Sequence, residues 1–331
     1  MHPQIQSDRL GTLSKFCVPR WTLLLLVHNM TIMFAEEFSS QGAMDVTIPS
    51  FGPNGMINWT LNAEEVIHAN ESTYFVKKPN LKMVAKENSV SNATSDAGTF
   101  DLSNGTASGE TLLKVSGDGF LAKGNPWFWR QQVENGTHQM SFESNAYVHF
   151  QSEIEPVLPR KKDDGFSPGK KIVKVENTVA MADMIEMVTR EEGGYLFVLD
   201  GNVSVKGELL EIHCLRMNII VENESNKSGM TFGRITEVNA TGNVLMKQVG
   251  RLCQANRLTL DTVMGKGLLL GNAKVEDAEW GIVSGEKIEL DKGTGRARVV
   301  GTEQKKPRLD LPNFGEINLP GLRKPQKKSP N

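Results

Sequence analysis

The chain has 331 residues, of which 39% are hydrophobic and 23% are charged, and its formal net charge is -2. This length is enough for two modest domains, each able to bury a core of its own. The nearly balanced charge gives no basic field that would attract nucleic acid and no acidic field that would attract a cationic partner. The 31 glycines favour tight turns between short strands.

The N-terminus has the pattern of an export signal. Arg9, Lys15 and Arg20 precede an apolar run at residues 21–35. This run is short for a transmembrane helix, which needs about 20 predominantly apolar residues. We therefore predict a cleaved signal peptide over residues 1–35, and an uncleaved membrane anchor is the alternative. Either form would place the rest of the chain outside the cytoplasm.

After residue 35 the sequence alternates between apolar and polar residues in short runs that Gly, Asn and Asp separate. Val203 and Val205 share one face of such a run, while Ser204 and Lys206 take the other. Strands show this alternation when one face is buried and the other is wet. No long amphipathic helix is predicted, so the predicted fold class is all-β.

A strand–turn–strand unit repeats through the second half of the chain. Each copy has a small residue, then two apolar residues that share a face, then an Asp followed by glycines. One copy contains Ala255, Leu258, Leu260, Asp261, Gly265 and Gly271, and the next contains Gly285, Ile288, Leu290, Asp291, Gly295 and Gly301. The Asp and the first Gly after it suit a short hairpin connection. Because neighbouring copies cover each other's apolar faces, the repeat predicts a solenoid-like or jelly-roll stack.

Composition divides the chain into two modules. Residues 156–171 combine prolines, glycines and a run of charges, which is typical of a linker. We place a domain boundary there, between one β module at 44–155 and another at 172–302. Residues 303–331 are rich in Pro, Lys and Arg, and we expect them to form a disordered basic tail.

The second module resembles the OstA-like domains of the lipopolysaccharide-transport family of LptA and LptC. The stretches LDGNV at 199–203, ATGNV at 240–244 and LLGNA at 269–273 resemble strand openings of those domains. Ala182–Asp183 and residues 284–301 do so as well. The resemblance covers residues 172–302.

The first module resembles the LptC relative of that family. The segments 55–63, 74–84 and 95–102 follow the order found in that relative. Two such modules in one chain depart from the usual arrangement, in which the modules are separate proteins.

This resemblance implies two consecutive antiparallel β-jelly-rolls with an apolar interior that is open at both ends. Members of the family bind the lipid A part of lipopolysaccharide and stack end to end into a bridge across the periplasm. The implied partners are therefore lipopolysaccharide and other Lpt-type β-jelly-roll proteins that add to the edge strands, with self-association as a further form. No cofactor, metal or nucleic acid is implied.

Twelve alternating apolar residues of the second module are expected to face the lipid groove. They are Val203, Val205, Ile212, Val244, Met246, Leu258, Leu260, Leu268, Leu270, Val275, Ile288 and Leu290. The same residues would form the core of any β-sandwich, so a purely structural role stays open for each of them.

Motifs that would indicate catalysis or metal binding are not found. The six histidines are scattered without ligand spacing, and His213 lies on the polar side of its strand. The sequence Gly-Lys-Gly at 265–267 lies between two strand runs, whereas a phosphate-binding loop precedes a helix. Cys17 lies in the signal segment, and Cys214 and Cys253 are predicted either as free buried thiols or as a disulfide. We do not expect an enzyme.

Two interpretations of function remain. The first is a non-enzymatic periplasmic carrier of lipopolysaccharide, as the resemblance implies. The second is a secreted β-solenoid or β-sandwich protein of the envelope, either structural or carbohydrate-binding. Large side chains that meet across the interior would favour the structural form, and an open apolar cavity would favour lipid carriage.

Overall fold

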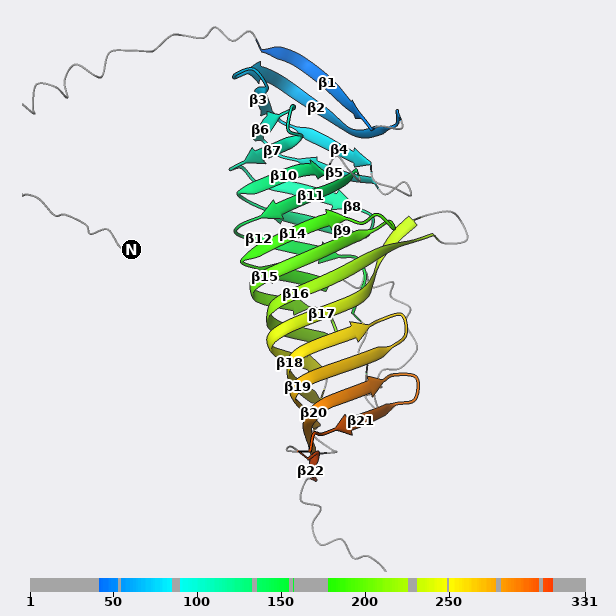
Figure 1. The fold of residues 1–331 in the computed structure, drawn as a ribbon. Coiled ribbons are helices and arrows are strands. Elements are labelled where there is room, and N and C mark those ends of the chain that lie inside the picture. Colours follow the sequence, from blue (N-terminus) through cyan, green and yellow to red (C-terminus); the bar gives the residue numbers. More distant parts are fainter. Residues whose placement is uncertain are drawn as a thin grey trace, which may run out of the picture. The chain divides into compact units, whose positions relative to one another are not determined.

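A computed structural model describes residues 42–52, 55–84, 90–132, 136–154, 157, 178–225, 231–248, 250–277, 281–303 and 306–311. Every regular element in these ranges is a β-strand, so the predicted all-β class is confirmed (Figure 1). Among these residues, no helix has the length and the apolar run needed to cross a membrane. The predicted signal segment 1–35 and, apart from Val157, the predicted linker 156–171 lie outside the described residues.

Within the described ranges, twenty-two strands follow one another. The first twelve are β1 (Ala43–Phe51), β2 (Ile57–His68), β3 (Thr73–Lys77), β4 (Asn80–Val84), β5 (Val90–Thr94), β6 (Ala97–Asp101), β7 (Thr106–Gly109), β8 (Leu113–Gly117), β9 (Phe120–Gly124), β10 (Trp127–Gln132), β11 (Thr137–Phe142) and β12 (Ala146–Phe150). The others are β13 (Thr178–Ala182), β14 (Met184–Thr189), β15 (Tyr195–Lys206), β16 (Leu210–Ser225), β17 (Thr231–Gln248), β18 (Arg251–Asp261), β19 (Lys266–Asp277), β20 (Gly281–Asp291), β21 (Arg296–Val300) and β22 (Arg308–Asp310). They form one antiparallel sheet.

The sheet is folded into two halves, which we call leaves. The fold arises because most of the long strands bend once near their middle. Residues 195–200 of β15 pair with β14, while residues 204–206 pair with β13. The strands β2 and β16 to β20 bend in the same way. Elsewhere two short successive strands, such as β3 and β4, take the place of one long bent strand.

Each leaf can be defined by the strands that it contains. The first leaf has β3, β6, β7, β10, β11, β14 and β21, and the second leaf has β4, β5, β8, β9, β12, β13 and β22. The strands β2 and β15 to β20 contribute one half to each leaf. We call the line of bends the corner, and the opposite side, where the turns of the two leaves lie, the mouth.

The corner is built by the Gly-Asn pairs that the sequence repeats. Gly201–Asn202, Gly242–Asn243 and Gly271–Asn272 all have positive φ, between 47° and 82°. The register of the sheet shifts at each pair, as expected for a β-bulge that bends its strand. Glycine and asparagine are the residues that adopt this backbone conformation most readily. At the first pair, Asn202 Nδ2 also donates to Asp183 Oδ2 at 2.8 Å.

Turns of the first leaf repeat a second motif. The Oδ1 atoms of Asp261 and Asp291 accept hydrogen bonds from the backbone N of Met264 and Thr294, at 2.7 and 3.1 Å. Gly265 and Gly295 follow with positive φ. The turns join β18 to β19 and β20 to β21 as antiparallel hairpins, so the predicted hairpin connections are confirmed. Asp101 and Gly105 form the same turn between β6 and β7.

Strands on either side of the predicted linker pair with each other. β12 pairs with β13, where Val148 is opposite Ala180, and β11 pairs with β14, where Met140 is opposite Met187. Both leaves therefore continue from the first predicted module into the second. Within the segment expected to be a disordered tail, β22 pairs with β20.

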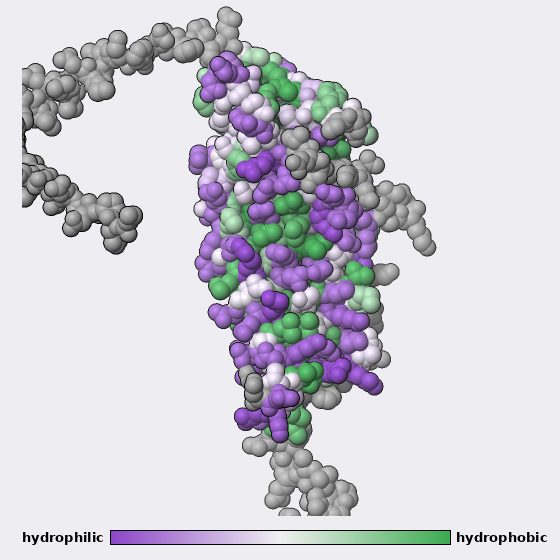
Figure 2. All heavy atoms as spheres, viewed as in Figure 1, coloured by the Kyte–Doolittle hydropathy of each residue, from purple (hydrophilic) through white to green (hydrophobic). Residues whose placement is uncertain are grey.

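Large side chains from the two leaves meet in the interior. The rings of Trp59 and Trp129 lie 5.7 Å apart and nearly perpendicular. Phe197 of the first leaf contacts Phe120 and Phe150 of the second, with centroids 5.0 and 5.1 Å apart. Such edge-to-face contacts fill the space between the leaves at these levels. The outer face shown in Figure 2 is by contrast mostly hydrophilic, with separate hydrophobic patches.

Candidate functional site

The inner face of the sheet holds most of the predicted groove residues. Those that are buried there are Val203, Val205, Ile212, Val244, Met246, Leu258, Leu260, Val275, Ile288 and Leu290. The most exposed of them is Val275, at 8%. They belong to the same hydrophobic cluster as Trp59 and Leu61 of β2. One apolar face therefore runs through both predicted modules.

The prediction that Leu268 and Leu270 face inward is wrong. Leu269 is the buried residue of this run, and it lies opposite Leu258 and Ile288, which are both fully buried. Leu268 and Leu270 are only partly buried and lie on the outer face. Three consecutive leucines have no alternation of their own, so the pairing with neighbouring strands decides which of them points inward.

A short segment after β12 crosses the mouth. We call its described residues, Gln151–Ile154 and Val157, the strap. Gln151 N donates to Gly119 O at 2.8 Å, and Ile235 N donates to Ser152 Oγ at 3.1 Å. Gly119 belongs to the turn between β8 and β9 at the edge of the second leaf, whereas Ile235 lies in the first-leaf half of β17. The strap therefore ties the two leaves together.

The two leaves also touch directly beside the strap. A Cβ atom on Gly119 would lie 2.6 Å from Gly233 Cα, and one on Gly233 would lie 2.2 Å from Asp118 O. Asn223 Nδ2 of the first leaf is 3.4 Å from Asp118 Oδ2. Only glycine allows so close an approach of two backbones. The mouth is closed at this level.

Two side chains of the strap belong to the core. Ile154 is 3% exposed and Val157 is 2% exposed. Val157 Cγ1 lies 3.3 Å from the position that a Cβ atom on Gly267 would take. Gly267 is an inner-face residue of β19 between Leu260 and Leu290, so its missing side chain leaves a notch that Val157 covers.

Sequence reasoning missed this part of the mouth. Val157 fell in the predicted linker, and two apolar residues near prolines give no periodicity that could assign them to a core. The signal that was present is Gly267, a residue without a side chain at an inner-face position where the neighbouring strands carry leucines.

A pocket lies alongside the strap. Its volume is about 340 Å³, and it is lined by Gln151, Ser152, Glu153, Phe232, Gly233, Arg234, Ile235 and Thr262. Phe232 is 42% exposed. This volume is at the lower end of the range for small-molecule sites, which is about 300–1,000 Å³.

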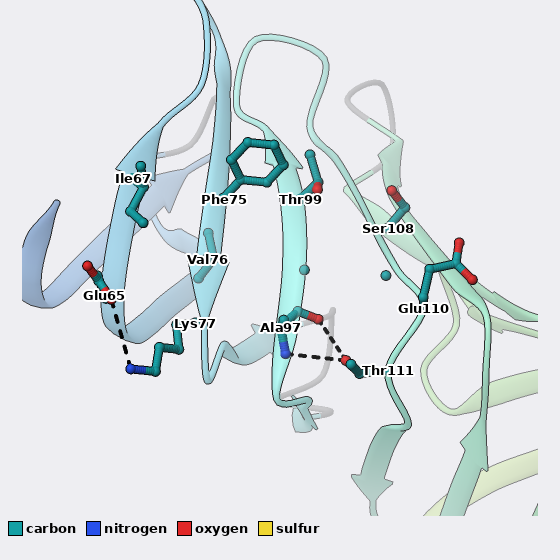
Figure 3. A pocket seen from close by; sticks show the side chains of 12 residues that line it. Glu65, Ile67, Phe75, Val76, Lys77, Ala97, Thr99, Ser108, Glu110 and Thr111 are labelled. Atoms are coloured by element: carbon teal, nitrogen blue, oxygen red, sulfur yellow. Dashed lines mark hydrogen bonds and ion pairs between the residues drawn. The ribbon is translucent and has the colours of Figure 1, made fainter. Parts of the chain in front are cut away.

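A second pocket, of about 430 Å³, lies on the outer face of the first leaf (Figure 3). Phe75, which is 56% exposed, and Ile67 give it an apolar side. Lys77 forms an ion pair with Glu65 at 3.9 Å. The Thr111 hydroxyl accepts a hydrogen bond from Ala97 N and donates one to Ala97 O. These side chains offer a place for a ligand but no nucleophile with a base beside it.

The interior also contains polar groups. His138 is fully buried, its ring stacks on Trp129 with 6.0 Å between centroids, and neither imidazole nitrogen makes a hydrogen bond of good geometry. Burial lowers the pKa of His138 to about 4, although the backbone of Val84 and Asn58 offsets part of this effect. Burial also raises the pKa of Tyr195 well above its ordinary value. Both side chains are therefore uncharged at neutral pH.

The thiols and His213 show no reactive arrangement. Cys214 and Cys253 are free and buried, and β17 lies between their strands. Burial raises their thiol pKa values to about 11 and about 12, which keeps them protonated at neutral pH. His213 lies on the outer face and its Nε2 is 2.9 Å from Glu211 Oε1. Within the described ranges, no group of three His, Cys, Asp or Glu side chains could hold a metal ion.

Neither a comparison with protein-family models nor one with curated proteins finds a match for this chain. Function is therefore inferred from two features that the fold builds. One is the continuous apolar inner face, and the other is the mouth with its strap.

Proposed function

We propose that this chain is a non-enzymatic carrier of lipopolysaccharide in the periplasm, an OstA-like bridge protein with an LptC-like and an LptA-like module. The observation that carries the proposal is the predominantly apolar inner face that runs from Trp59 in β2 to Leu290 in β20. A lipid that crosses an aqueous compartment needs such a face along its whole path.

The cost of exposing lipid to water explains this need. Each methylene group removed from water contributes about 0.8 kcal/mol. An acyl chain of roughly a dozen carbons therefore resists aqueous crossing by about 10 kcal/mol, and lipid A carries several such chains. Inner-face methionines suit a surface whose contents move, because their side chains are flexible and polarizable. The buried ones are Met83, Met140, Met187, Met217 and Met246.

The ends of the sheet suit assembly into a bridge. Among the described strands, β1 pairs only with β2, and β21 and β22 pair only with β20. Each end therefore offers backbone groups to an added strand. Met44 and Phe51 of β1 are both 61% exposed and would be covered by such a partner. The partner is another Lpt-type β-jelly-roll or a second copy of this chain.

A structural scaffold of the envelope is the second candidate. The contacts of Phe197 with Phe120 and Phe150 favour it, because they fill the interior between β9 and β15 with large side chains. A scaffold needs a filled core and no path for lipid. The lipid carrier instead requires that these side chains move apart when lipid is present.

Photo-crosslinking to lipopolysaccharide separates the two candidates. A photoreactive amino acid replaces Leu260, which is 1% exposed on the inner face, and the control replaces its neighbour Thr259 on the outer face. We expect lipid adducts at position 260 and none at 259, with circular dichroism confirming that both variants are folded. Equal labelling, or no labelling of folded protein, would leave the scaffold as the better account.

A further inference from the structure

The strap differs from every other described inner segment, because it enters the interior from the mouth and not as part of a leaf. Its Ile154 and Val157 side chains complete the core, yet their backbone is outside the sheet ladder. Hydrogen bonds of its described residues run from Gln151 N to Gly119 O and from Ile235 N to Ser152 Oγ, and Glu208 N also donates to Glu153 Oε1 at 3.3 Å.

The surface beneath Val157 is shaped for a narrow apolar group. Gly267 lies between Leu260 and Leu290, so the inner face has a notch with leucine walls. A Cβ atom on Gly267 would be 3.4 Å from both leucines and 3.3 Å from Val157 Cγ1. Val157 therefore occupies a position where a linear hydrocarbon chain would make the same contacts.

A pocket of about 340 Å³ lies beside the strap, where Gln151, Ser152 and Glu153 line it. Its wall includes Ser152 and Glu153 of the strap on one side and Phe232 and Ile235 of β17 on the other. Phe232 gives this wall an apolar side chain that is 42% exposed. Polar groups at the rim include Arg234, which pairs with Glu224 at 3.1 Å.

We propose that the notch at Gly267 is a binding site for a single long acyl chain, and that the strap is its built-in occupant. The acyl chain enters through the pocket beside the strap and displaces Val157 and Ile154. Binding then breaks the hydrogen bonds of Gln151 N and of Ser152 Oγ. This inference rests on the proposed lipid-carrying function and names the place where an acyl chain enters the interior.

A competing occupant lowers the apparent affinity for the ligand, because only the fraction of molecules with the strap displaced can bind. Weakening the strap should therefore tighten binding. Filling the notch should weaken binding even though it also displaces Val157. These opposite effects distinguish a ligand site from a segment that only completes the core.

The probe is dansylaminoundecanoic acid, whose fluorescence rises in an apolar site, titrated into the purified chain. Val157→Thr keeps the side-chain volume but adds a buried hydroxyl, and we expect the probe Kd to fall at least fivefold. Val263→Thr makes the same change at a residue that is 57% exposed, and its Kd should stay within twofold of the wild type. Gly267→Val fills the notch and should raise Kd at least tenfold.

The outcomes separate this inference from the proposed function. If the wild type binds the probe but Val157→Thr does not lower its Kd, the inference is wrong. It is also wrong if Gly267→Val lowers the Kd as much as Val157→Thr does. Neither result contradicts the proposed lipid carriage. If neither the wild type nor any variant binds the probe, the inference and the proposed lipid-carrying function are both contradicted. Hydrogen exchange of the wild-type Gln151 and Ile235 amides provides a test without substitution. Saturating probe should speed their exchange, and unchanged or slower exchange would overturn the inference.

Discussion

Gly119 and Gly233 meet backbone to backbone across the mouth, although they come from the β8–β9 turn of one leaf and from β17 in the other. A Cβ atom on Gly119 would be 2.6 Å from Gly233 Cα, and Gly119 has a φ of 78°. An alanine at this position would face a backbone clash and an unfavourable conformation together. The contact is therefore a sensitive probe of how firmly the leaves are held.

We expect Gly119→Ala to lower the free energy of unfolding by about 3 kcal/mol, of which about 1 kcal/mol comes from the left-handed backbone. Gly250→Ala is the control, since Gly250 has a φ of 75° but would place its Cβ atom in open space. Urea unfolding of both variants gives the comparison. Equal losses would show that the two leaves do not press together at Gly119.

Asn202 tests how the corner is specified. Its φ is 47°, and its Nδ2 donates to Asp183 Oδ2. Asn202→Ala and Asn202→Gly both remove this hydrogen bond. Only alanine is strained in the left-handed conformation, because glycine has no Cβ atom. We expect alanine to destabilise by about 1 kcal/mol more than glycine, measured by thermal or urea unfolding. If the two variants are equally stable, the backbone conformation is not what asparagine supplies at the corner.

Much of this fold could be predicted from local pattern. The alternation around Val203 and Val205 correctly indicated their buried face, and the Asp261–Gly265 spacing correctly indicated a hairpin. Both signals are properties of a few consecutive residues. The repeated Gly-Asn pairs were visible as well, and the structure gives them a physical meaning as left-handed bulges that bend each strand.

The features that could not be predicted depend on residues far apart in the sequence. Nothing near Gly119 indicates that it packs against Gly233, and nothing near Val157 indicates that it covers Gly267. The phase of the leucines at 268–270 also depends on neighbouring strands. Long-range pairing decides such features, and period-two alternation describes only one strand at a time.

The position of Leu269 on the inner face, with Leu268 and Leu270 on the outer face, leads to a direct prediction. Leu269→Ala should destabilise the protein by about 2–5 kcal/mol, because it opens a cavity in the core. Leu268→Ala and Leu270→Ala remove side chains from the outer face and should each cost less than about 1 kcal/mol. Urea unfolding of the three variants provides matched comparisons within one strand. A larger loss at position 268 or 270 would contradict the register of β19.

His138 should make stability depend on pH in a defined window. Its pKa is lowered by burial from 6.5 to about 4, so between these values the unfolded chain binds more protons than the folded one. Stability is therefore complete above pH 6.5 and is lost as the pH falls toward 4. At 1.36 kcal/mol per pKa unit the loss reaches about 3 kcal/mol. Glu64 and Asp101, whose pKa values are lowered to about 2 by their hydrogen-bond partners, lose their contributions only below pH 4.5 and 3.8.

The measurement is urea unfolding at intervals from pH 4 to pH 8 for the wild type and for His138→Phe. Phenylalanine keeps an aromatic ring against Trp129 and has no group to protonate. We expect the wild type to lose stability relative to the variant as the pH falls from 6.5 to 4, and the difference to be constant above 6.5. Subtracting the two curves removes the contribution of Asp118, whose pKa burial raises. Parallel curves over the whole range would show that His138 is protonated as easily in the folded protein as in the unfolded chain, and hence that the interior around Trp129 admits water.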